Sequence, residues 1–557
     1  MVKAKIISFS KPVDNFTTFF LDNGIALLAS SILKDGHQVT IQDYGTLEMC
    51  DYFKLEEPLR SKIKYISSEM LNLSRTGNDI NKNQQNIINE SVNNLKKYQK
   101  EKIDELASAC AQQAFDDNLD VILVKVWNGL GTYFFKKLSL EIKHFEKKER
   151  KKIYIYGGGP QVGWFNKHLL KFVPEADGLI FGEGEYSVRE LLHAIDKKKE
   201  VNTIPGLIHK NNGKIHFNPQ NWIDELSVLP YANYDKSIYK SNQNNQKIKF
   251  ICIDPSRGCP NKCFFCNHHH ESGDYWRSKK PEIVVDEIKH YITTYGVRYF
   301  KYSGSSTPPD LRARIAEELI RQKIQIRYIT FINTNTVTEK DIFLLKESGC
   351  FAIFFGIESG NEKILNRSIG TKNSLQNIRK AVTLAKNAGI YTVGSLIIPA
   401  PHDTDETIKE TIDFMMDVGV DSSPILPPLL TGTETEWSQN SEKYGIAKEK
   451  DWIEKMLLWD INLNIPSTFW EPLPYTVNGL KFAEFSNITN KISNIFLRNK
   501  IPQISDEMAL MARLYGQNEN DFVFDTNIEL RENNTNKLAE RIKAINQRIV
   551  CEEDSLL

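Results

Sequence analysis

The chain has few cysteines, no net charge and no long apolar run. Eight cysteines among 557 residues are too sparse for a disulfide-stabilised scaffold. The 71 basic and 71 acidic residues cancel, which argues against nucleic-acid binding driven by overall charge. The sequence contains neither the roughly 18 consecutive apolar residues of a membrane span nor the pattern of a signal peptide. We therefore expect a cytoplasmic protein with no membrane span and no nucleic-acid partner.

The first part of the sequence alternates short apolar strands with helical segments. Strands are predicted at 3–9, 38–42, 120–125, 152–156 and 178–181. This alternation is typical of a doubly wound, Rossmann-like sheet. We predict such a domain over residues 1–225, with a polar helical insertion at about 47–118, a hairpin at 206–217 and a linker at 226–247.

A second alternating series begins near residue 249. Its predicted strands lie at 249–254, 299–302, 325–331, 351–356 and 392–398, each separated from the next by a helical segment. Such a series predicts a full or partial (β/α) barrel over residues 248–445. The remaining residues, 446–557, are predicted to form a mostly helical C-terminal domain, so the whole chain falls in the α/β class.

Three of the cysteines are clustered directly after the first strand of the second series. Cys259, Cys263 and Cys266 fall on a predicted loop, and thiolates suit iron–sulfur clusters or zinc. Three thiolates without a fourth nearby would leave one iron of a [4Fe–4S] cluster open to a chelating substrate. The alternative is a non-catalytic zinc-binding module, in which a histidine from 268–270 completes a Cys₃His site.

The Cys-x3-Cys-x2-Cys spacing, on the loop after a first barrel strand, resembles the signature of the radical S-adenosylmethionine (SAM) enzymes. Residues 277–288 are similar to the family's entry into its first barrel helix. Members of the family often have acidic residues directly after the second strand. This chain has only serine, threonine and proline there, at 305–309. The resemblance implies a [4Fe–4S] cluster on the three cysteines and a SAM site formed by Phe265, Ser303, Gly304, Ser305, Glu358, Gly394 and Ser395.

Residues 1–225 resemble the cobalamin-binding domain that precedes the barrel in the class B-like radical SAM methyltransferases. The sequence lacks the Asp-x-His-x-x-Gly motif, so the resemblance implies cobalamin bound without a protein imidazole. The matching residues, which we predict to surround the cofactor, are Trp127, Asn128, Gly157, Gly158, Gly159, Gly182, Glu183, Gly184 and Glu185.

The resemblance implies reductive cleavage of SAM followed by methylation of an unactivated carbon or phosphorus. The expected partners are a natural-product-type small molecule or a peptide as substrate, and a reduced flavodoxin- or ferredoxin-type electron donor. Rearrangement, cyclisation and aminocarboxypropyl transfer remain alternative outcomes. The sequence assigns no catalytic residue. The insertion at 47–118 and the region after 445 are expected to shape the substrate pocket.

Overall fold

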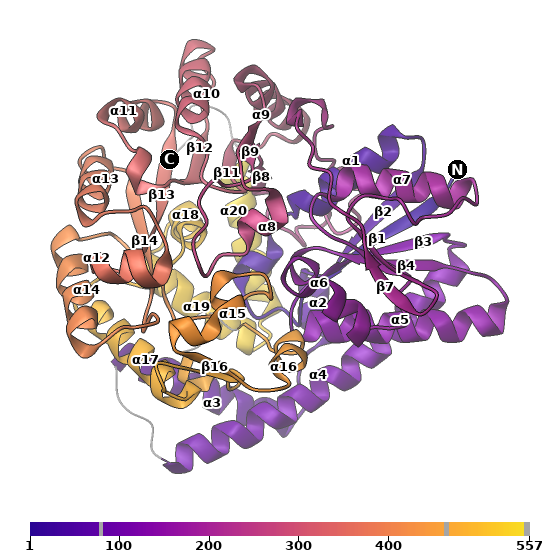
Figure 1. The fold of residues 1–557 in the computed structure, drawn as a ribbon, viewed down its shortest axis with the longest axis horizontal. Coiled ribbons are helices and arrows are strands. Elements are labelled where there is room, and N and C mark those ends of the chain that lie inside the picture. Colours follow the sequence, from indigo (N-terminus) through magenta and orange to yellow (C-terminus); the bar gives the residue numbers. More distant parts are fainter. Residues whose placement is uncertain (77–81, 462–466, 551–557) are drawn as a thin grey trace.

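The computed structural model describes residues 1–76, 82–461 and 467–550. Its core consists of two largely parallel sheets, one from each half of the chain, with helices around both (Figure 1). The sheets are built from the two alternating series that the sequence predicts. The α/β class, the doubly wound N-terminal sheet and the helical C-terminal region are confirmed.

The N-terminal sheet has seven strands. Those from β2 to β5 in the sheet order are parallel, and β6 and β7 continue the edge as an antiparallel hairpin. Nearly every residue of β1 and β3 is buried, as expected for parallel strands covered on both faces. The order is β2 (Gln38–Asp43), β1 (Lys3–Phe9), β3 (Val121–Val126), β4 (Tyr154–Gly158), β5 (Gly178–Ile180), β6 (Leu207–Asn211) and β7 (Lys214–Phe217).

Four helices cover the N-terminal sheet. The helices α1 and α7 pack against each other and contribute to one hydrophobic core, whereas α5 and α6 contribute to another. The expected hairpin at 206–217 is confirmed, and it extends this sheet. The bounds of the helices are α1 (Asn23–Lys34), α5 (Leu130–Glu149), α6 (Pro160–Phe172) and α7 (Gly184–Asp196).

The polar segment 47–118 is helical, as predicted. It forms α2 (Leu47–Tyr52), α3 (Leu59–Thr76) and the long α4 (Lys82–Asp116). The helix α4 packs along α5, and α3 packs on the C-terminal helices (Figure 1). The insertion therefore packs against both the N-terminal domain and the C-terminal helices.

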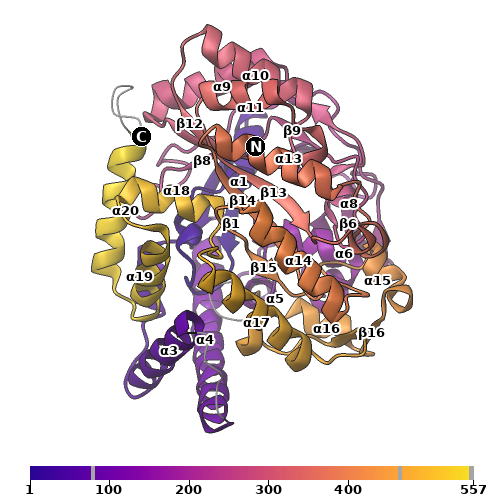
Figure 2. The ribbon, with the colours of Figure 1, turned by 90° about the vertical axis from the view of Figure 1, so that its left-hand side faces the viewer.

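The second sheet is an open set of six parallel strands, so the predicted barrel is partial. The sequence analysis missed β15, a two-residue strand with prolines before and after it. Helices α9, α10, α11, α13 and α14 form an outer layer over this sheet (Figure 2). The strand order is β15 (Ile425–Leu426), β14 (Tyr391–Ile397), β13 (Cys350–Glu358), β12 (Arg327–Phe331), β11 (Tyr299–Tyr302) and β8 (Ile251–Ile253).

Further helices belong to the barrel and to the C-terminal region. Within the described ranges, no helix is both long and apolar enough to cross a membrane. Their bounds are α9 (Pro281–Tyr295), α10 (Pro309–Arg321), α11 (Glu339–Glu347), α13 (Leu375–Asn387), α14 (Asp405–Val418), α16 (Trp452–Leu457), α17 (Phe482–Arg498), α18 (Asp506–Tyr515), α19 (Glu519–Arg531) and α20 (Thr535–Ile549).

Candidate functional site

The three cysteines lie on one loop that is closed at its base. The strands β9 (Ser256–Arg257) and β10 (Arg277–Ser278) pair antiparallel, with Arg257 opposite Arg277. The intervening residues, 258–276, form the segment that we call the cysteine loop. It follows β8, at the carboxyl edge of the barrel sheet, which is where parallel α/β folds bind ligands.

Backbone hydrogen bonds fix the shape of the cysteine loop. The Cys259 N–H donates to the Gly273 carbonyl over 3.0 Å, and the Phe264 N–H donates to the Ile369 carbonyl over 2.8 Å. The Phe264 carbonyl accepts from the Trp437 N–H over 3.0 Å. The loop is thus bonded to itself and to two later segments of the chain before any ligand binds.

The chemistry of the loop fits a metal cluster. Burial raises the pKa of the Cys263 thiol to about 12 and that of Cys266 to about 11. A metal ion reverses this preference, because it binds the deprotonated thiolate. Buried polar atoms normally have partners, yet the loop contains several without one: Asn267 Oδ1, His268 Nε2, His269 Nδ1 and Trp276 Nε1. These atoms are available to a bound group.

The histidines that favoured zinc do not converge with the cysteines. Among the described residues, no group of three or more His, Cys, Asp or Glu side chains lies close enough together to hold one metal ion. A cluster does not require such convergence, because each thiolate binds a different iron. The geometry therefore suits a cluster better than the Cys₃His alternative.

The serines after β11 bind to the base of the cysteine loop. Ser303 Oγ donates to Asp254 Oδ1 over 2.5 Å, and Ser305 Oγ donates to the Gly258 carbonyl over 2.5 Å. Gly304 lies between them with a φ of 89°. These three of the predicted SAM residues therefore lie directly beside the loop. The hydroxyl groups of both serines already form hydrogen bonds within the protein.

Glu358 and Ser395 come together from neighbouring strands. Glu358 ends β13 with a φ of 68°, and its Oε1 accepts a 3.4 Å hydrogen bond from Ser395 Oγ in β14. Burial raises the pKa of the Glu358 carboxyl to about 8, and Cys263 and Cys266 lie near enough to interact with it electrostatically. Gly394 precedes Ser395 and leaves room for the Ile357 side chain. Phe265 packs instead against Trp437, with ring centroids 5.7 Å apart.

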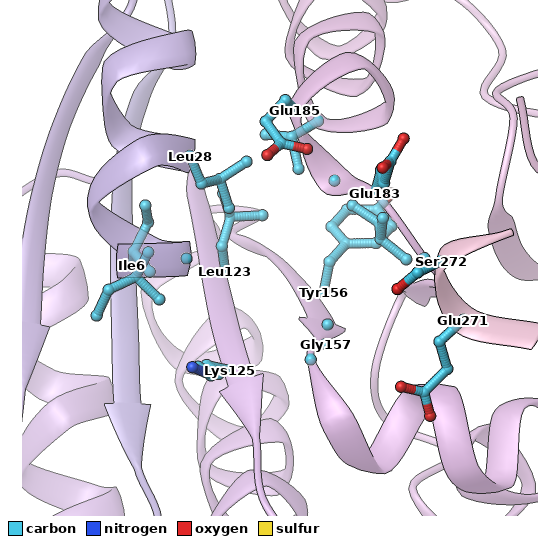
Figure 3. A pocket seen from close by; sticks show the side chains of 18 of the residues that line it. Ile6, Leu28, Leu123, Lys125, Tyr156, Gly157, Glu183, Glu185, Glu271 and Ser272 are labelled. Carbon is cyan, nitrogen blue, oxygen red and sulfur yellow. The ribbon is translucent and has the colours of Figure 1, made fainter. Parts of the chain in front are cut away.

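A cavity of about 300 Å³ lies between the N-terminal sheet and the cysteine loop (Figure 3). Its floor is apolar, and the glycine-rich turns after β4 and β5 form one side. The cysteine loop supplies the facing side, with His268, Glu271 and Ser272. The predicted cobalamin residues that line this cavity are Gly157, Gly158, Gly159, Gly182, Glu183, Gly184 and Glu185.

Trp127 and Asn128 line a second cavity, of about 570 Å³, and not the first. Both cavities include Lys125 and Asp254 in their walls, so they adjoin. The C-terminal region contributes Asp460 to the second cavity. Among the described residues of the helical insertion, none lines either cavity, and its helices α4 and α3 pack on α5 and on the C-terminal helices.

The sequence analysis missed several residues of the site. Arg257 and Arg277, at the base of the cysteine loop, form ion pairs with Glu183 and Glu185 of the N-terminal domain. Burial raises the pKa of Glu271 to about 7. The two arginines flank the cysteine segment in the sequence, and that position is the only local signal for them.

Gly258 provides a test of the loop geometry. Its φ is +83°, and a Cβ at this position would lie 2.0 Å from the Tyr275 carbonyl oxygen. We expect Gly258→Ala to distort the cysteine loop, lower the melting temperature and reduce iron and sulfide after reconstitution to well below four per chain. Gly213→Ala is the matched control, because Gly213 has a φ of +75° but no atom within 4 Å of its Cβ position. Equal iron loading in both variants would contradict the predicted role of the loop.

Comparison with known proteins agrees with this geometry. Residues 253–415 match the radical SAM superfamily. An uncharacterized methyltransferase of Pyrococcus horikoshii is 31% identical over 282 residues, which cover 49% of this chain and 60% of the relative. An anaerobic magnesium-protoporphyrin IX monomethyl ester cyclase of Rubrivivax gelatinosus is 26% identical over 275 residues, which cover 47% of this chain and 48% of the relative. The match thus spans less than two thirds of either relative.

The fold is shared with a solved structure of the same superfamily. The radical SAM methyltransferase TsrM of Kitasatospora setae, solved with cobalamin and a [4Fe–4S] cluster, aligns with a TM-score of 0.61 at 15% identity. The alignment covers 81% of each chain, so it includes the N-terminal sheet as well as the barrel. Residues 253–415 therefore form a radical SAM domain, and the chain as a whole shares the fold of this structure, which contains cobalamin and a [4Fe–4S] cluster.

Proposed function

We propose that this protein is a radical SAM methyltransferase that uses a [4Fe–4S] cluster and cobalamin. The observation that carries the proposal is the preformed cysteine loop, which holds three thiols at the carboxyl edge of a parallel barrel and faces a glycine-lined cavity. The curated relative from Pyrococcus horikoshii and the structurally similar TsrM are both named methyltransferases, which supports the proposed reaction.

The bound groups would supply the reactive chemistry. A cluster on the three thiolates would deliver the electron, taken from a flavodoxin- or ferredoxin-type donor, that cleaves SAM to a 5′-deoxyadenosyl radical, and cobalamin would supply the methyl group. The protein holds and orients these groups and limits the access of water. Within the loop, the rings of Phe265 and Phe264 pack at a tilt against Trp437 and Tyr444, and these contacts add apolar surface beside the cysteines.

Glu358 and Ser395 are the side chains best placed to orient SAM. They lie together near the carboxyl ends of β13 and β14, and the electrostatic interaction of Glu358 with Cys263 supports a position of the pair near the proposed cluster. Burial of a carboxylate is costly without a partner, and the ammonium group or a ribose hydroxyl of SAM would provide one.

The first cavity fits part of a large, flat cofactor. Gly159 has a φ of +91° and precedes α6, and the N-terminus of α7 lies beside Glu183. Glycine turns allow a ligand to approach the backbone closely. Leu28, Leu123, Tyr156 and Val188 form an apolar end, suited to an aromatic base. About 300 Å³ cannot enclose all of cobalamin, so the remainder would extend along the interface toward the second cavity.

The part of the second cavity nearest the barrel is where we place the substrate. Cys252, Asp254 and Ser303 line this part. Three lysines of the cavity each pair with a different aspartate: Lys11 with Asp14, Lys125 with Asp22, and Lys247 with Asp43. Among the described residues, no lysine forms an ion pair with Asp460, although Lys11 acts on it electrostatically, and burial raises the pKa of Asp460 to about 6. A polar organic substrate that donates hydrogen bonds suits this lining.

Ring formation is the second candidate reaction, because one of the relatives is named a cyclase. It would use the same cluster and the same SAM cleavage. Product analysis separates the two reactions, since methyl transfer produces S-adenosylhomocysteine in a cobalamin-dependent manner and cyclisation does not. Methylthioadenosine would instead indicate transfer of the aminocarboxypropyl group.

Substitution of one cysteine tests the proposed activity. We expect Cys263→Ala, purified without oxygen and reconstituted with iron and sulfide, to form at least about 100-fold less 5′-deoxyadenosine, because loss of a ligand exceeds the roughly 10–100-fold cost of losing a residue that supports one. The assay contains reductant and SAM, and liquid chromatography quantifies the products. Cys50→Ala is the control, because Cys50 is a buried cysteine that lies in α2, outside the loop. Wild-type protein with one bound zinc and no SAM cleavage would refute the proposal.

Glu358 tests the proposed SAM site. We expect Glu358→Gln to raise the dissociation constant for SAM about tenfold, since a hydrogen bond to a charged group is worth about 1.5–3 kcal/mol. Equilibrium dialysis with labelled SAM on the cluster-loaded protein measures this constant. Glu362→Gln removes an exposed carboxylate four residues later and should leave it unchanged. If both variants bind SAM like the wild type, Glu358 does not contact SAM.

A further inference from the structure

The cysteine loop is attached to the N-terminal domain through its base. Arg257 and Arg277 face each other across the β9–β10 pair, so every candidate ligand of the cluster lies between them in the sequence. Two like charges at adjacent strand positions repel each other unless counter-charges lie nearby. Any group that neutralises both arginines therefore also determines how the loop leaves the barrel.

Two of the counter-charges come from one short segment of the N-terminal domain. Both carboxylate oxygens of Glu183 accept hydrogen bonds from Arg277 Nη1, over 2.8 and 2.7 Å. Arg257 Nη1 lies 3.4 Å from Glu183 Oε1, and Arg257 Nη2 donates to Glu185 Oε1 over 2.7 Å. A third carboxylate, Asp254 of the barrel, lies 3.5 Å from Arg257 Nη2. The side chains of Arg277 and Glu183 are only 2% and 6% exposed, so the network is buried.

Arg277 also connects the network to its surroundings. Its Nη1 donates to the Ile223 carbonyl over 3.0 Å, and its Nη2 donates to the Ser272 carbonyl within the cysteine loop. The guanidinium lies 5.3 Å from the centre of the Trp222 ring. One side chain thus contacts Glu183 in the N-terminal domain, residues 222–223 at the end of that domain, and the cysteine loop.

The same residues border the first cavity. Glu183 and Glu185 line it from the N-terminal domain, and Glu271 and Ser272 line it from the cysteine loop (Figure 3). A ligand that fills this cavity contacts both the segment that binds the arginines and the loop that the arginines support. A buried ion network contributes little net stability compared with apolar packing, but it strongly favours one arrangement of its members.

We propose that Glu183, Glu185, Arg257 and Arg277 form an interdomain clamp, which positions the cysteine loop so that binding of cobalamin in the cavity and of the cluster on the loop strengthen each other. The four are positioning residues, since they act through the loop. The inference rests on the proposed function for the identity of the two ligands. Because coupling between binding sites is reciprocal, it can be measured from either ligand.

The experiment measures hydroxocobalamin binding to the complete chain, with and without the reconstituted cluster, by the change in cobalamin absorbance. In the wild type, we expect the cluster to tighten binding at least about tenfold, which is about 1.4 kcal/mol. In Glu183→Gln, the cluster should change the affinity by less than about twofold, and this ratio measures the coupling even where the substitution also changes the affinity of the cluster-free protein. Addition of cobalamin should change the electron paramagnetic resonance signal of the reduced cluster in the wild type but not in Glu183→Gln.

Two further variants keep the result interpretable. Glu185→Gln removes a single contact, to Arg257, and should lose part of the coupling even if Glu183→Gln does not fold. Glu318→Gln breaks an exposed pair with Arg321 on α10 and should keep the full coupling. A purely structural role would lower the melting temperature and weaken both affinities equally, which would leave the coupling intact.

The outcomes separate the clamp from the proposed function. Wild-type coupling retained in both Glu183→Gln and Glu185→Gln overturns the clamp, as does a wild type that binds both groups independently. A wild type that assembles the cluster but binds no hydroxocobalamin overturns the proposed cofactor and the coupling together. Coupling that disappears in the glutamate variants and persists in Glu318→Gln supports the clamp.

Discussion

The site depends on the neutralisation of two arginines at the base of the cysteine loop. Arg257 and Arg277 are adjacent across two very short strands, and such a pair is unfavourable without buried counter-charges. Glu183 and Glu185 provide them from the other domain. Backbone hydrogen bonds to Ile369 and Trp437 also hold the loop, but β9 and β10 are only two residues long, so these carboxylates add the main ionic contacts at its base. The contact between the domains and the base of the loop therefore share one ion network.

Parallel topology explains why the functional residues gather at this interface. In a parallel sheet, every strand ends at the same edge, so the loops that follow the strands are neighbours in space. Both sheets place such loops at the interface. The glycine turns after β4 and β5 come from one sheet, and the cysteine loop and Ser303–Ser305 come from the other. Cavities lined by both domains follow from this arrangement.

Two carboxyl groups near the cysteine loop are buried, and burial disfavours their ionised form. Burial raises the pKa of Glu358 to about 8 and that of Glu271 to about 7. Each has a single side-chain hydrogen bond that opposes this effect, from Ser395 and from Asn267 respectively. Such groups interact strongly with any cation or hydrogen-bond donor that arrives, because the low local dielectric strengthens the interaction.

The sequence by itself determined the order of strands and helices, the cysteine spacing and the glycine turns, because each depends on residues close together in the chain. Apolar periodicity was sufficient for five strands of each sheet, but not for β15, which is too short to show a period. Only the tertiary structure decided that Glu183 and Glu185 face arginines, and that Trp127 and Asn128 belong to a different cavity from the glycine turns. These pairings join residues 70 or more positions apart, such as Glu185 with Arg257, and no local pattern encodes the partner of a buried charge.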